Sequence, residues 1–399
     1  MKYVFMDGVF LWFSLAFFLC NRHVQSQPNY VFKVTEFGAI PDGKTDSSNA
    51  FASVWKKACE TQGGLVVVPF GTYFVSSATF QGPCNGKTLL QIDGNIIASS
   101  DPSLNKENWI QFYSLDGLDV SGRGTFDGRG ASAWPYNNCD VSSNCNLPPV
   151  SIDITSVKNA SFRGINSINS KGFHFNIVGS DNVVIKNVHI TAPKDSPNTD
   201  GIHIGKSNNI KIFNTHISTG DDCVSLGDGN TNINITRVWC GPGHGISIGS
   251  LGKYKGEEDV RGITVRNCSF DNTENGLRIK TWAPSTVSTT VSDVTFEEII
   301  ANNVENPVII DQYYCPHSAC SHSGESTIGI NGVKFINVKG TSATQVSVNI
   351  RCSKAKHCTN IELSGFDLKL QGTGEPTTAL CSNADAKIFG SNQLPLHCS

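Results

Sequence analysis

Apolar and polar residues alternate along most of this chain in short runs, and an asparagine or another turn residue introduces each run. Residues 182–190 and 209–217 are two clear copies, and equivalent apolar starts recur at Ala160, Val183, Ile210, Ile233, Ile263, Val294, Val333 and Ile361. An alternation with a period of two is typical of strands that bury one face. We therefore predict strands in one shared register that repeat every 23 to 39 residues.

A repeat of this length, built from short strands, indicates a solenoid in which each copy forms one coil. A propeller needs four strands in about 40–45 residues, and a leucine-rich repeat needs a ladder of Leu and Asn. The chain shows neither pattern. The predicted fold class is therefore all-β, a right-handed parallel β-helix.

One short amphipathic helix stands apart from the strands, near residues 46–62. Thr45 and Asp46 precede it as capping candidates. Its apolar positions follow helical spacing, at Phe51, Val54, Trp55, Ala58 and Cys59. Because an open solenoid end exposes edge strands, we predict that this helix caps the N-terminal end.

Composition agrees with a turn-rich β protein. The chain has 399 residues, of which 39% are hydrophobic and 16% charged, and it contains 38 Gly. The formal net charge of -3 excludes a general nucleic-acid binder and a polybasic membrane-surface protein, since both need a positive field. No apolar run beyond the N-terminus is long enough to span a bilayer, so we predict no membrane partner and a single domain over residues 27–399.

The first 26 residues have the pattern of a secretory signal peptide. Lys2 gives a weakly positive start, residues 9–20 form an apolar run, and residues 24–26 offer a cleavage site. A single membrane anchor is the alternative, but this run is too short to cross a bilayer comfortably. We predict a secreted mature chain that starts near Gln27.

Secretion makes the 14 cysteines interpretable as disulfides, although the sequence alone leaves their connectivity open. Short loops suggest six pairs: Cys59 with Cys84, Cys139 with Cys145, Cys223 with Cys240, Cys315 with Cys320, Cys352 with Cys358, and Cys381 with Cys398. Cys20 falls in the signal segment, and Cys268 is left over. N-glycosylation sequons begin at Asn159, Asn234 and Asn267.

A second set of strands carries the candidate chemistry. Residues 172–175, 201–204, 223–226, 245–248 and 276–279 align, and the residues just before them are Lys171, Asp200, Asp222, His244 and Asn275. Equivalent positions in a parallel sheet lie roughly 4.8 Å apart. We therefore predict a ladder of Asp200, Asp222 and His244, with Asp221 beside it and Arg278 and Lys280 further along the same surface.

Such a ladder suits the hydrolysis of a glycosidic bond. Three close carboxylates repel one another, which raises the pKa of at least one of them and keeps a proton ready. Glycoside hydrolysis needs one carboxylic acid and one carboxylate. Arg278 and Lys280 would bind a substrate carboxylate, so the predicted partner is an acidic polysaccharide. Taken singly, an Asp in a turn more often has a structural role, and His244, Arg278 and Lys280 are as often structural, in a turn or on a strand face, as functional.

Four short motifs here resemble, in order and spacing, those of the polygalacturonase family of glycoside hydrolases: Asn198-Thr199-Asp200, Gly220-Asp221-Asp222, Gly243-His244-Gly245 and Arg278-Ile279-Lys280. The resemblance covers most of the mature chain. Residues 196–205 and 241–252 are most similar to the plant pollen-type exopolygalacturonases.

The resemblance implies a role for each matching position. Asp221 would be the general acid, Asp200 and Asp222 would activate water, and His244 would hold the acid in its protonation state. Substrate-binding positions would be Asn198, Arg278, Lys280 and Tyr314, with Tyr313 as a rival for the tyrosine. The family implies inversion of configuration, no metal and no cofactor. It also implies a monomer that acts on polygalacturonate or pectin outside the cell, in the wall.

The resemblance favours removal of residues from the non-reducing end, and an endo-acting polygalacturonase is the first alternative. A Ca²⁺-dependent pectate lyase and a non-catalytic β-helix that only binds wall glycan are the others. A lyase makes products that absorb ultraviolet light and is stopped by a chelator. A binding protein releases no reducing ends.

Overall fold

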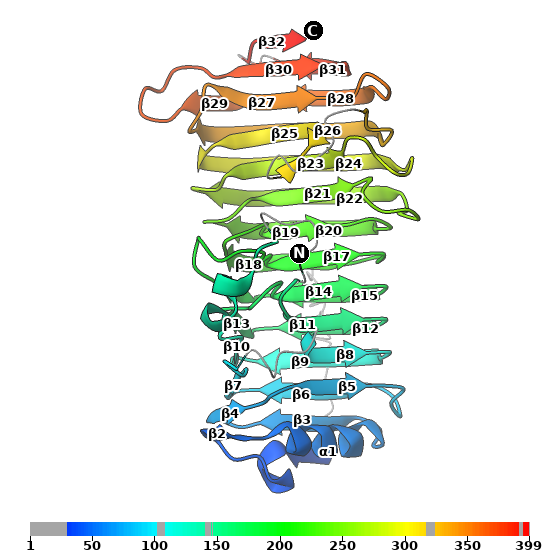
Figure 1. Cartoon of the computed structure of the whole chain (residues 1–399), viewed down its shortest axis with the longest axis vertical. Coiled ribbons are helices and arrows are strands. Elements are labelled where there is room, and N and C mark those ends of the chain that lie inside the picture. Colours follow the sequence, from blue (N-terminus) through cyan, green and yellow to red (C-terminus); the bar gives the residue numbers. More distant parts are fainter. Residues whose placement is uncertain are drawn as a thin grey trace, which may run out of the picture.

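The computed structural model describes residues 30–101, 108–139, 145, 147–316, 324–390 and 394–398. The strands stack as successive coils from the helix α1 (Ser48–Cys59) at one end to β32 (Leu396–Cys398) at the other (Figure 1). Strands pair in parallel in both sheets, which confirms the predicted right-handed parallel β-helix. The predicted signal segment, residues 1–26, lies outside the described residues.

Twelve strands of the described chain form one sheet, which we call the site sheet: β5 (Ala78–Gln81), β8 (Asn108–Tyr113), β11 (Val150–Thr155), β14 (Phe175–Val178), β17 (Ile202–Gly205), β19 (Val224–Leu226), β21 (Ile246–Leu251), β23 (Asn275–Trp282), β25 (Asn306–Tyr314), β27 (Val346–Arg351), β30 (Thr378–Ser382) and β32.

The remaining strands form the opposite sheet, which bends around the other sides of the coils: β1 (Tyr30–Lys33), β2 (Asp42–Asp46), β3 (Gly64–Val68), β4 (Thr72–Phe74), β6 (Thr88–Ile92), β7 (Asn95–Ile97), β9 (Asp116–Gly122), β10 (Thr125–Asp127), β12 (Lys158–Arg163), β13 (Asn166–Ile168), β15 (Asp181–Lys186), β16 (His189–Thr191), β18 (Lys211–Ser218), β20 (Thr231–Cys240), β22 (Val260–Asp271), β24 (Thr290–Val304), β26 (Gly329–Ser342), β28 (Cys358–Ser364), β29 (Asp367–Leu370) and β31 (Ala384–Phe389). Short 3-10 helices are η1 (Val34–Phe37), η3 (Gly130–Ser132) and η4 (Trp134–Tyr136).

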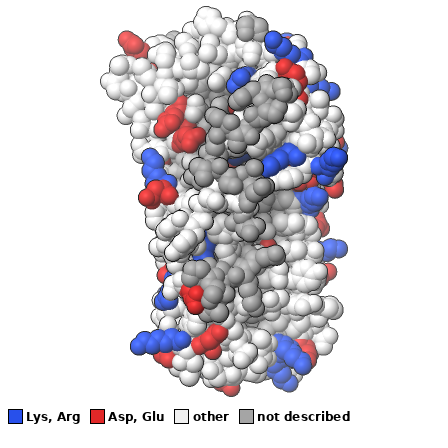
Figure 2. All heavy atoms as spheres, viewed as in Figure 1, with Lys and Arg blue, Asp and Glu red and all other residues white. Residues whose placement is uncertain are grey.

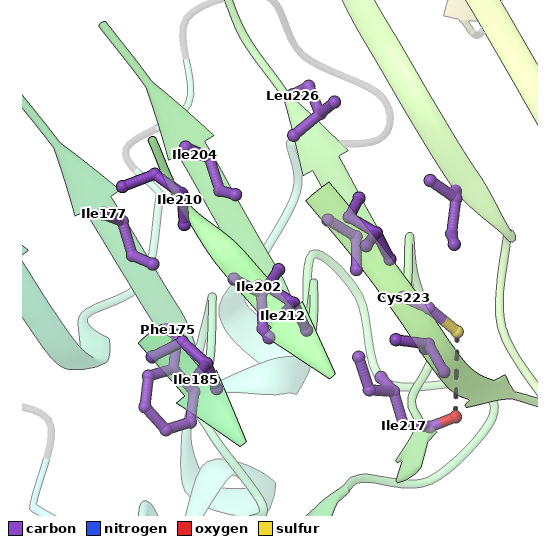
Figure 3. Packing of buried hydrophobic residues seen from close by; sticks show 14 of the residues in the cluster. Phe175, Ile177, Ile185, Ile202, Ile204, Ile210, Ile212, Ile217, Cys223 and Leu226 are labelled. Atoms are coloured by element: carbon purple, nitrogen blue, oxygen red, sulfur yellow. Dashed lines mark hydrogen bonds between the residues drawn. The ribbon is translucent and has the colours of Figure 1, made fainter. Parts of the chain in front are cut away.

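Inward side chains of successive coils stack on one another and form one continuous core. The predicted register is confirmed: Ala160 pairs with Val183, Ile233 with Ile263, Ile263 with Val294, Val294 with Val333, and Val333 with Ile361. Figure 3 shows Ile202, Ile204 and Ile212 directed into this interior. Each such side chain adds roughly 1.5–3 kcal/mol by leaving water, and this burial stabilises the stack.

Asparagine introduces many strands because the turn before them needs a left-handed residue. Asn159, Asn182 and Asn209 have φ of 53°, 54° and 54°. Asn182 donates a hydrogen bond to Asn159 at 2.7 Å, and Asn209 donates to Asn182 at 3.2 Å. The Asn159 amide also donates to Asp116 at 2.7 Å, so the nitrogen that a glycan at this sequon would use belongs to the ladder.

Both ends of the stack are protected, the N-terminal end by the predicted helix. Helix α1 buries Phe51, Val54, Trp55 and Ala58 as predicted, and it begins after Ser47 rather than after Thr45 or Asp46. Asp46 still contributes, since its carboxylate accepts a hydrogen bond from the Ser48 N–H at 3.0 Å. At the other end, the Cys381–Cys398 disulfide ties β32 to β30.

Five of the six predicted disulfides are confirmed: Cys59–Cys84, Cys139–Cys145, Cys223–Cys240, Cys352–Cys358 and Cys381–Cys398. Cys315 is also disulfide-bonded, but its predicted partner Cys320 lies outside the described residues. Cys268 is a free thiol whose side chain faces the core from β22. Burial raises the pKa of this thiol to about 12, so Cys268 serves as a small apolar core residue.

One predicted alignment is wrong by two residues. The sequence pattern matched Gly172 with Gly201, but in the structure Phe175 pairs with Ile202. A shift of two residues keeps every side chain on the same face, so alternation alone does not exclude it. Lys171 is therefore absent from the ladder. Its ammonium donates instead to the carbonyl oxygens of Ser99 at 2.8 Å and Gly128 at 2.7 Å.

Uncharged residues cover most of the face seen in Figure 2, and charged side chains are scattered over it in both signs. This agrees with the charged fraction of 16%. Among the described residues, no helix has both the length and the apolar character needed to cross a bilayer.

Candidate active site

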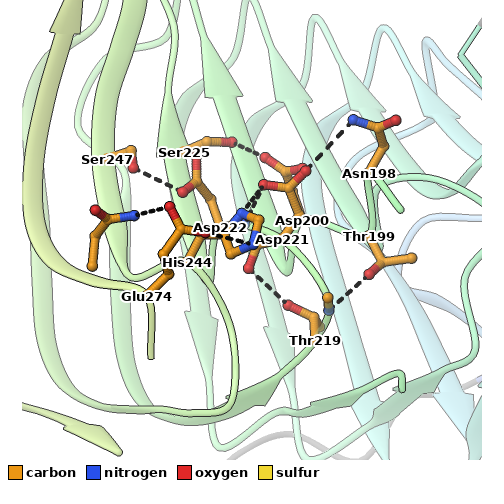
Figure 4. Close-up of polar contacts among 12 residues, drawn as sticks. Asn198, Thr199, Asp200, Thr219, Asp221, Asp222, Ser225, His244, Ser247 and Glu274 are labelled. Atoms are coloured by element: carbon orange, nitrogen blue, oxygen red, sulfur yellow. Dashed lines mark hydrogen bonds and ion pairs between the residues drawn. The ribbon is translucent and has the colours of Figure 1, made fainter. Parts of the chain in front are cut away.

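The candidate site lies on the outer face of the site sheet, at the turns that lead into β17, β19, β21 and β23 (Figure 4). Glycine is required at two of these turns. A Cβ on Gly220 would lie 2.0 Å from the Ser196 carbonyl oxygen, and a Cβ on Gly245, whose φ is +88°, would lie 2.2 Å from that of Asn275. Glycine thus lets successive turns approach closely enough for the acidic and basic side chains to meet.

Asp222 is an ionised carboxylate enclosed by donors. One of its oxygens accepts from Arg278 at 2.7 Å and from Ser247 at 2.8 Å, and the other accepts from Lys280 at 2.9 Å. Burial by itself raises the pKa of Asp222, but the charges of Lys280 and Arg278 outweigh burial and hold this pKa well below its ordinary value. Asp222 therefore stays charged while its side chain is only 2% exposed.

Asp200 has the opposite electrostatics. It is 6% exposed, and its one close neutral partner is Ser225, which donates to it at 2.6 Å. Burial, followed by the charges of Asp221 and Asp222, raises the pKa of Asp200 well above its ordinary value. This is the direction that the sequence led us to expect for one member of the carboxylate cluster, and the group with the raised pKa is Asp200.

Asp221 and His244 form a pair at the edge of the site. His244 Nδ1 lies 3.1 Å from Asp221 Oδ1, and His244 Nε2 lies 3.3 Å from Glu274 Oε2. Burial lowers the pKa of His244, but the hydrogen bond to Asp221 and the charges of Asp221 and Glu274 raise it on balance. A protonated imidazole satisfies both contacts, because only that form donates from both nitrogens.

The two oxygens of Asp221 have different surroundings. Oδ1 accepts from His244 and also from the Asp222 N–H at 2.7 Å. Oδ2 lies 3.5 Å from the Asn198 amide nitrogen, a long contact. Since Oδ1 is already a double acceptor, Oδ2 is the oxygen that can carry a proton toward a ligand.

Asn198 is fixed by a residue from a distant coil. Asn137, just after η4, donates to Asn198 Oδ1 at 3.0 Å. This bond orients the Asn198 amide so that its nitrogen faces Asp221. Cys139, two residues after Asn137, lines the same pocket as Asn198.

A pocket of about 440 Å³ opens over these groups, and its lining includes Asn198, Asp221, His244, Glu274, Arg278, Lys280 and Tyr314. Arg278 donates from Nε to Ser247 and from Nη2 to Asp222, so Nη1 is the guanidinium nitrogen left for a ligand among the described contacts. Lys280 Nζ lies 5.2 Å from the Tyr314 ring centre. Tyr313 lines a neighbouring pocket instead, so Tyr314 is the tyrosine at the site.

Asp221, Asp222 and His244 also lie close enough to hold a metal ion, with ligand atoms within 4.8 Å of one another. The surrounding contacts disfavour this use. Both Asp222 oxygens are already bonded to cationic side chains, and a cation would compete with Arg278 and Lys280 for them. The donor set instead suits a protonated imidazole between two carboxylates.

The structure brings together every predicted site residue: Asn198, Asp200, Asp221, Asp222, His244, Arg278, Lys280 and Tyr314. Glu274, Ser225, Ser247 and Asn137 were missed. Glu274 precedes Asn275 just as Asp221 precedes Asp222, and both serines lie in the aligned strands, so the alignment held a signal for all three. Asn137 had no signal, because its contact spans 61 residues of sequence.

We expect Glu274→Gln to move the alkaline limb of the kcat/KM profile to lower pH. Glu274 raises the pKa of His244, and a raised histidine pKa keeps the imidazole protonated up to higher pH. Without that charge, His244 loses its proton at lower pH, and Asp221 loses the positive charge beside it. The measurement is kcat/KM against pH, with Glu297→Gln on the opposite sheet as the control. An unchanged alkaline limb would show that Glu274 does not influence the titration of His244.

Residues 59–390 match the family described as glycosyl hydrolases family 28. An exopolygalacturonase of Platanus acerifolia is 45% identical over 381 residues, covering 95% of this chain and 100% of that protein. A polygalacturonase of Gossypium barbadense is 43% identical over 375 residues, with coverages of 94% and 91%. The crystal structure of a hyperthermoactive exopolygalacturonase from Thermotoga maritima has a TM-score of 0.75 at 20% identity, covering 92% of each chain.

Proposed function

Because this chain belongs to glycosyl hydrolases family 28, we propose that it is a polygalacturonase that hydrolyses the α-1,4-galacturonosyl linkages of pectin. One observation carries this proposal: Asp221, Arg278 and Lys280 line a single pocket, and the buried carboxyl groups of Asp222, which binds both cations, and Asp200, whose pKa is shifted in the opposite direction, lie beside them. The carboxyl groups supply acid and base, and the two cations supply recognition of a uronate.

Incubation with polygalacturonate tests this function. We expect new reducing ends at mildly acid pH, no rise in ultraviolet absorbance, and activity that survives a chelator. Rising absorbance with chelator sensitivity would indicate a lyase. Binding without any reducing ends would indicate a non-catalytic glycan-binding protein.

We assign the role of general acid to Asp221. Its Oδ2 is the oxygen free to carry the proton to the leaving group. When the proton leaves, the protonated His244 and the Asp222 N–H stabilise the carboxylate that forms on Oδ1. Asn198 orients the same group from the other side.

We assign the activation of water to Asp200 and Asp222. The raised pKa of Asp200 makes its carboxylate the stronger base of the two once it has lost its proton. Asp222 stays ionised and adds negative charge beside the positive charge that develops on the sugar ring.

We propose that the reaction inverts the anomeric configuration. Oxygens of Asp221 and Asp222 approach within 4.8 Å, whereas roughly 6.5–9.5 Å separate the carboxyl groups of inverting enzymes, so inversion by this site requires Asp200 to hold the attacking water. Besides Asp222, Asp200 is the other carboxyl group that can position the attacking water. Proton NMR of the first product decides: a β-anomer from the α-linked polymer supports inversion, and an α-anomer would overturn it.

Arg278→Ala is expected to weaken binding of the acidic polymer more than binding of a neutral glycan. Arg278 lines the pocket with a free Nη1, and a charge-assisted hydrogen bond to a carboxylate contributes about 1.5–3 kcal/mol. We therefore expect KM for polygalacturonate to rise by about tenfold or more. Arg278→Lys is the conservative comparison. Equal loss on acidic and neutral glycans would argue against carboxylate recognition.

We propose exo action, which the exopolygalacturonases among the relatives support. Cys139 and Asn198 line the pocket beside the catalytic groups, and Asn137 holds Asn198 in place there. Chromatography of early products from a long galacturonan tests the mode, since an exo enzyme releases monomer and an endo enzyme a spread of oligomers.

We further propose that the protein is secreted to the cell wall and acts as a monomer. Its disulfides support folding in an oxidising compartment. N-terminal sequencing of the secreted protein and light scattering test these two points.

A further inference from the structure

A second pocket, of about 540 Å³, adjoins the catalytic pocket on the C-terminal side. Tyr314 lines both pockets, so a chain that leaves the catalytic groups past Tyr314 enters the second one. The second pocket also contains Asp311, Tyr313 and Arg351. It belongs to the same face of the site sheet as the catalytic groups.

The strand register places Arg351 at the position equivalent to Lys280, two strands further along the site sheet. Lys280 pairs with Asp311, and Asp311 pairs with Arg351, so these residues occupy one position on β23, β25 and β27. Arg351 therefore stands two strands beyond Lys280, or roughly 10 Å along the axis of the coils. This is the reach of a short oligosaccharide that already has one residue at Lys280.

Arg351 is held in place but only weakly neutralised. Its guanidinium lies 4.6 Å from the Tyr313 ring centre, and Tyr313 is itself fixed by a 2.7 Å hydrogen bond to Glu325. Its ion pair among the described residues is a long contact of 4.0 Å with Asp311, and its side chain is 58% exposed. Arg278, by contrast, lies 2.7 Å from Asp222 and is almost buried.

Asp311 is a poor competitor for this guanidinium. Burial raises the pKa of Asp311, although the Tyr313 N–H and the nearby arginines oppose the rise. As pH falls into the acid range, Asp311 takes up a proton before an ordinary aspartate does and releases Arg351. A guanidinium has five donors, so a second carboxylate can also bind on its open edge.

We propose that this pocket is a second uronate subsite, in which Arg351 binds the carboxylate of a galacturonate residue beyond the one held by Arg278 and Lys280. The inference rests on the proposed polygalacturonase function and extends it. The fixed Tyr313 ring keeps the guanidinium plane in position, so little side-chain freedom is lost on binding. The enzyme then recognises more of the chain than the two residues that flank the cleaved bond.

Comparison of Arg351→Gln with the wild-type enzyme on two substrates tests this subsite. Digalacturonate fills only the positions beside the cleaved bond, whereas hexagalacturonate reaches Arg351. We expect KM for hexagalacturonate to rise by about tenfold with kcat unchanged, and both constants for digalacturonate to stay as they are. Arg351→Lys keeps the positive charge but loses the paired N–H donors of the guanidinium. Its KM for hexagalacturonate should lie between those of the wild-type enzyme and Arg351→Gln. Arg266→Gln on the opposite sheet is the control.

Hexagalacturonate binding to Asp221→Asn and to the double variant with Arg351→Gln, measured by titration calorimetry, tests the subsite without turnover. A tenfold weaker affinity in the double variant supports the subsite. It does so even if the wild-type enzyme hydrolyses nothing, because absence of hydrolysis would overturn only the proposed function. Unchanged affinity, or an equal loss on digalacturonate and hexagalacturonate, would overturn the subsite while hydrolysis by the wild-type enzyme still stood.

Discussion

Asp221→Asn is expected to abolish turnover of polygalacturonate almost completely while substrate binding is retained. The amide keeps the size of the side chain and still accepts from His244 and from the Asp222 N–H. It has no proton to give to the leaving oxygen, and general acid catalysis contributes about 10²–10⁴-fold. The measurement is kcat on polygalacturonate, together with polymer affinity by titration calorimetry.

Asp367→Asn is the matched control, because Asp367 lies at the start of β29, on the opposite sheet. It should leave kcat unchanged. Asp200→Asn provides a second comparison, since Asp200 carries the raised pKa. If Asp221→Asn stayed active while Asp200→Asn did not, the acid would be Asp200 and our assignment would be wrong.

Asp222→Ala is expected to lower the free energy of unfolding by about 3–5 kcal/mol and to remove activity. The substitution leaves the buried Arg278 and Lys280 without the carboxylate that both contact. Two uncompensated cations in a site that is nearly closed to water are costly. Equilibrium denaturation in guanidinium chloride measures the loss.

The pH dependence of this loss has a definite sign. Because the pKa of Asp222 is lowered by folding, its stabilising effect is present above the ordinary value of 3.8 and fades as pH falls through the lower folded value. The stability gap between the wild-type enzyme and Asp222→Ala should therefore narrow in strong acid.

Asp200 is the contrasting case. Folding raises its pKa, so its contribution is fully present below 3.8 and is lost as pH rises through the folded value. Asn has the shape of the protonated, neutral carboxyl, so Asp200→Asn should cost little stability in acid and should stabilise the fold at neutral pH, where Asp200 would otherwise be charged. The difference in the free energy of unfolding between the wild-type enzyme and Asp222→Ala should vary with pH and exceed that for Asp200→Asn. If it did neither, the charged triad of Asp222, Arg278 and Lys280 would be contradicted.

Much of the fold was predictable because a solenoid repeats one local rule. Each coil buries alternate residues, so the register from Ala160 to Ile361 followed from alternation and turn asparagines alone. The segment around Phe175 was not predictable to the residue, since a slip of two positions leaves the same faces buried.

The sequence by itself determined the coil repeat, the helix α1 and the column of Asp200, Asp222 and His244, because each depends on residues one coil apart or less. The tertiary structure alone decided the electrostatics. Asp200 and Asp222 occupy equivalent turns, yet one meets a serine and two carboxylates and the other meets Arg278 and Lys280. It also decided that Asn137 braces Asn198 and that Arg351 continues the line of Lys280. The charge of each group depends on its burial and on contacts with residues that are distant in the sequence. Neither can be read from the order of residues along the chain.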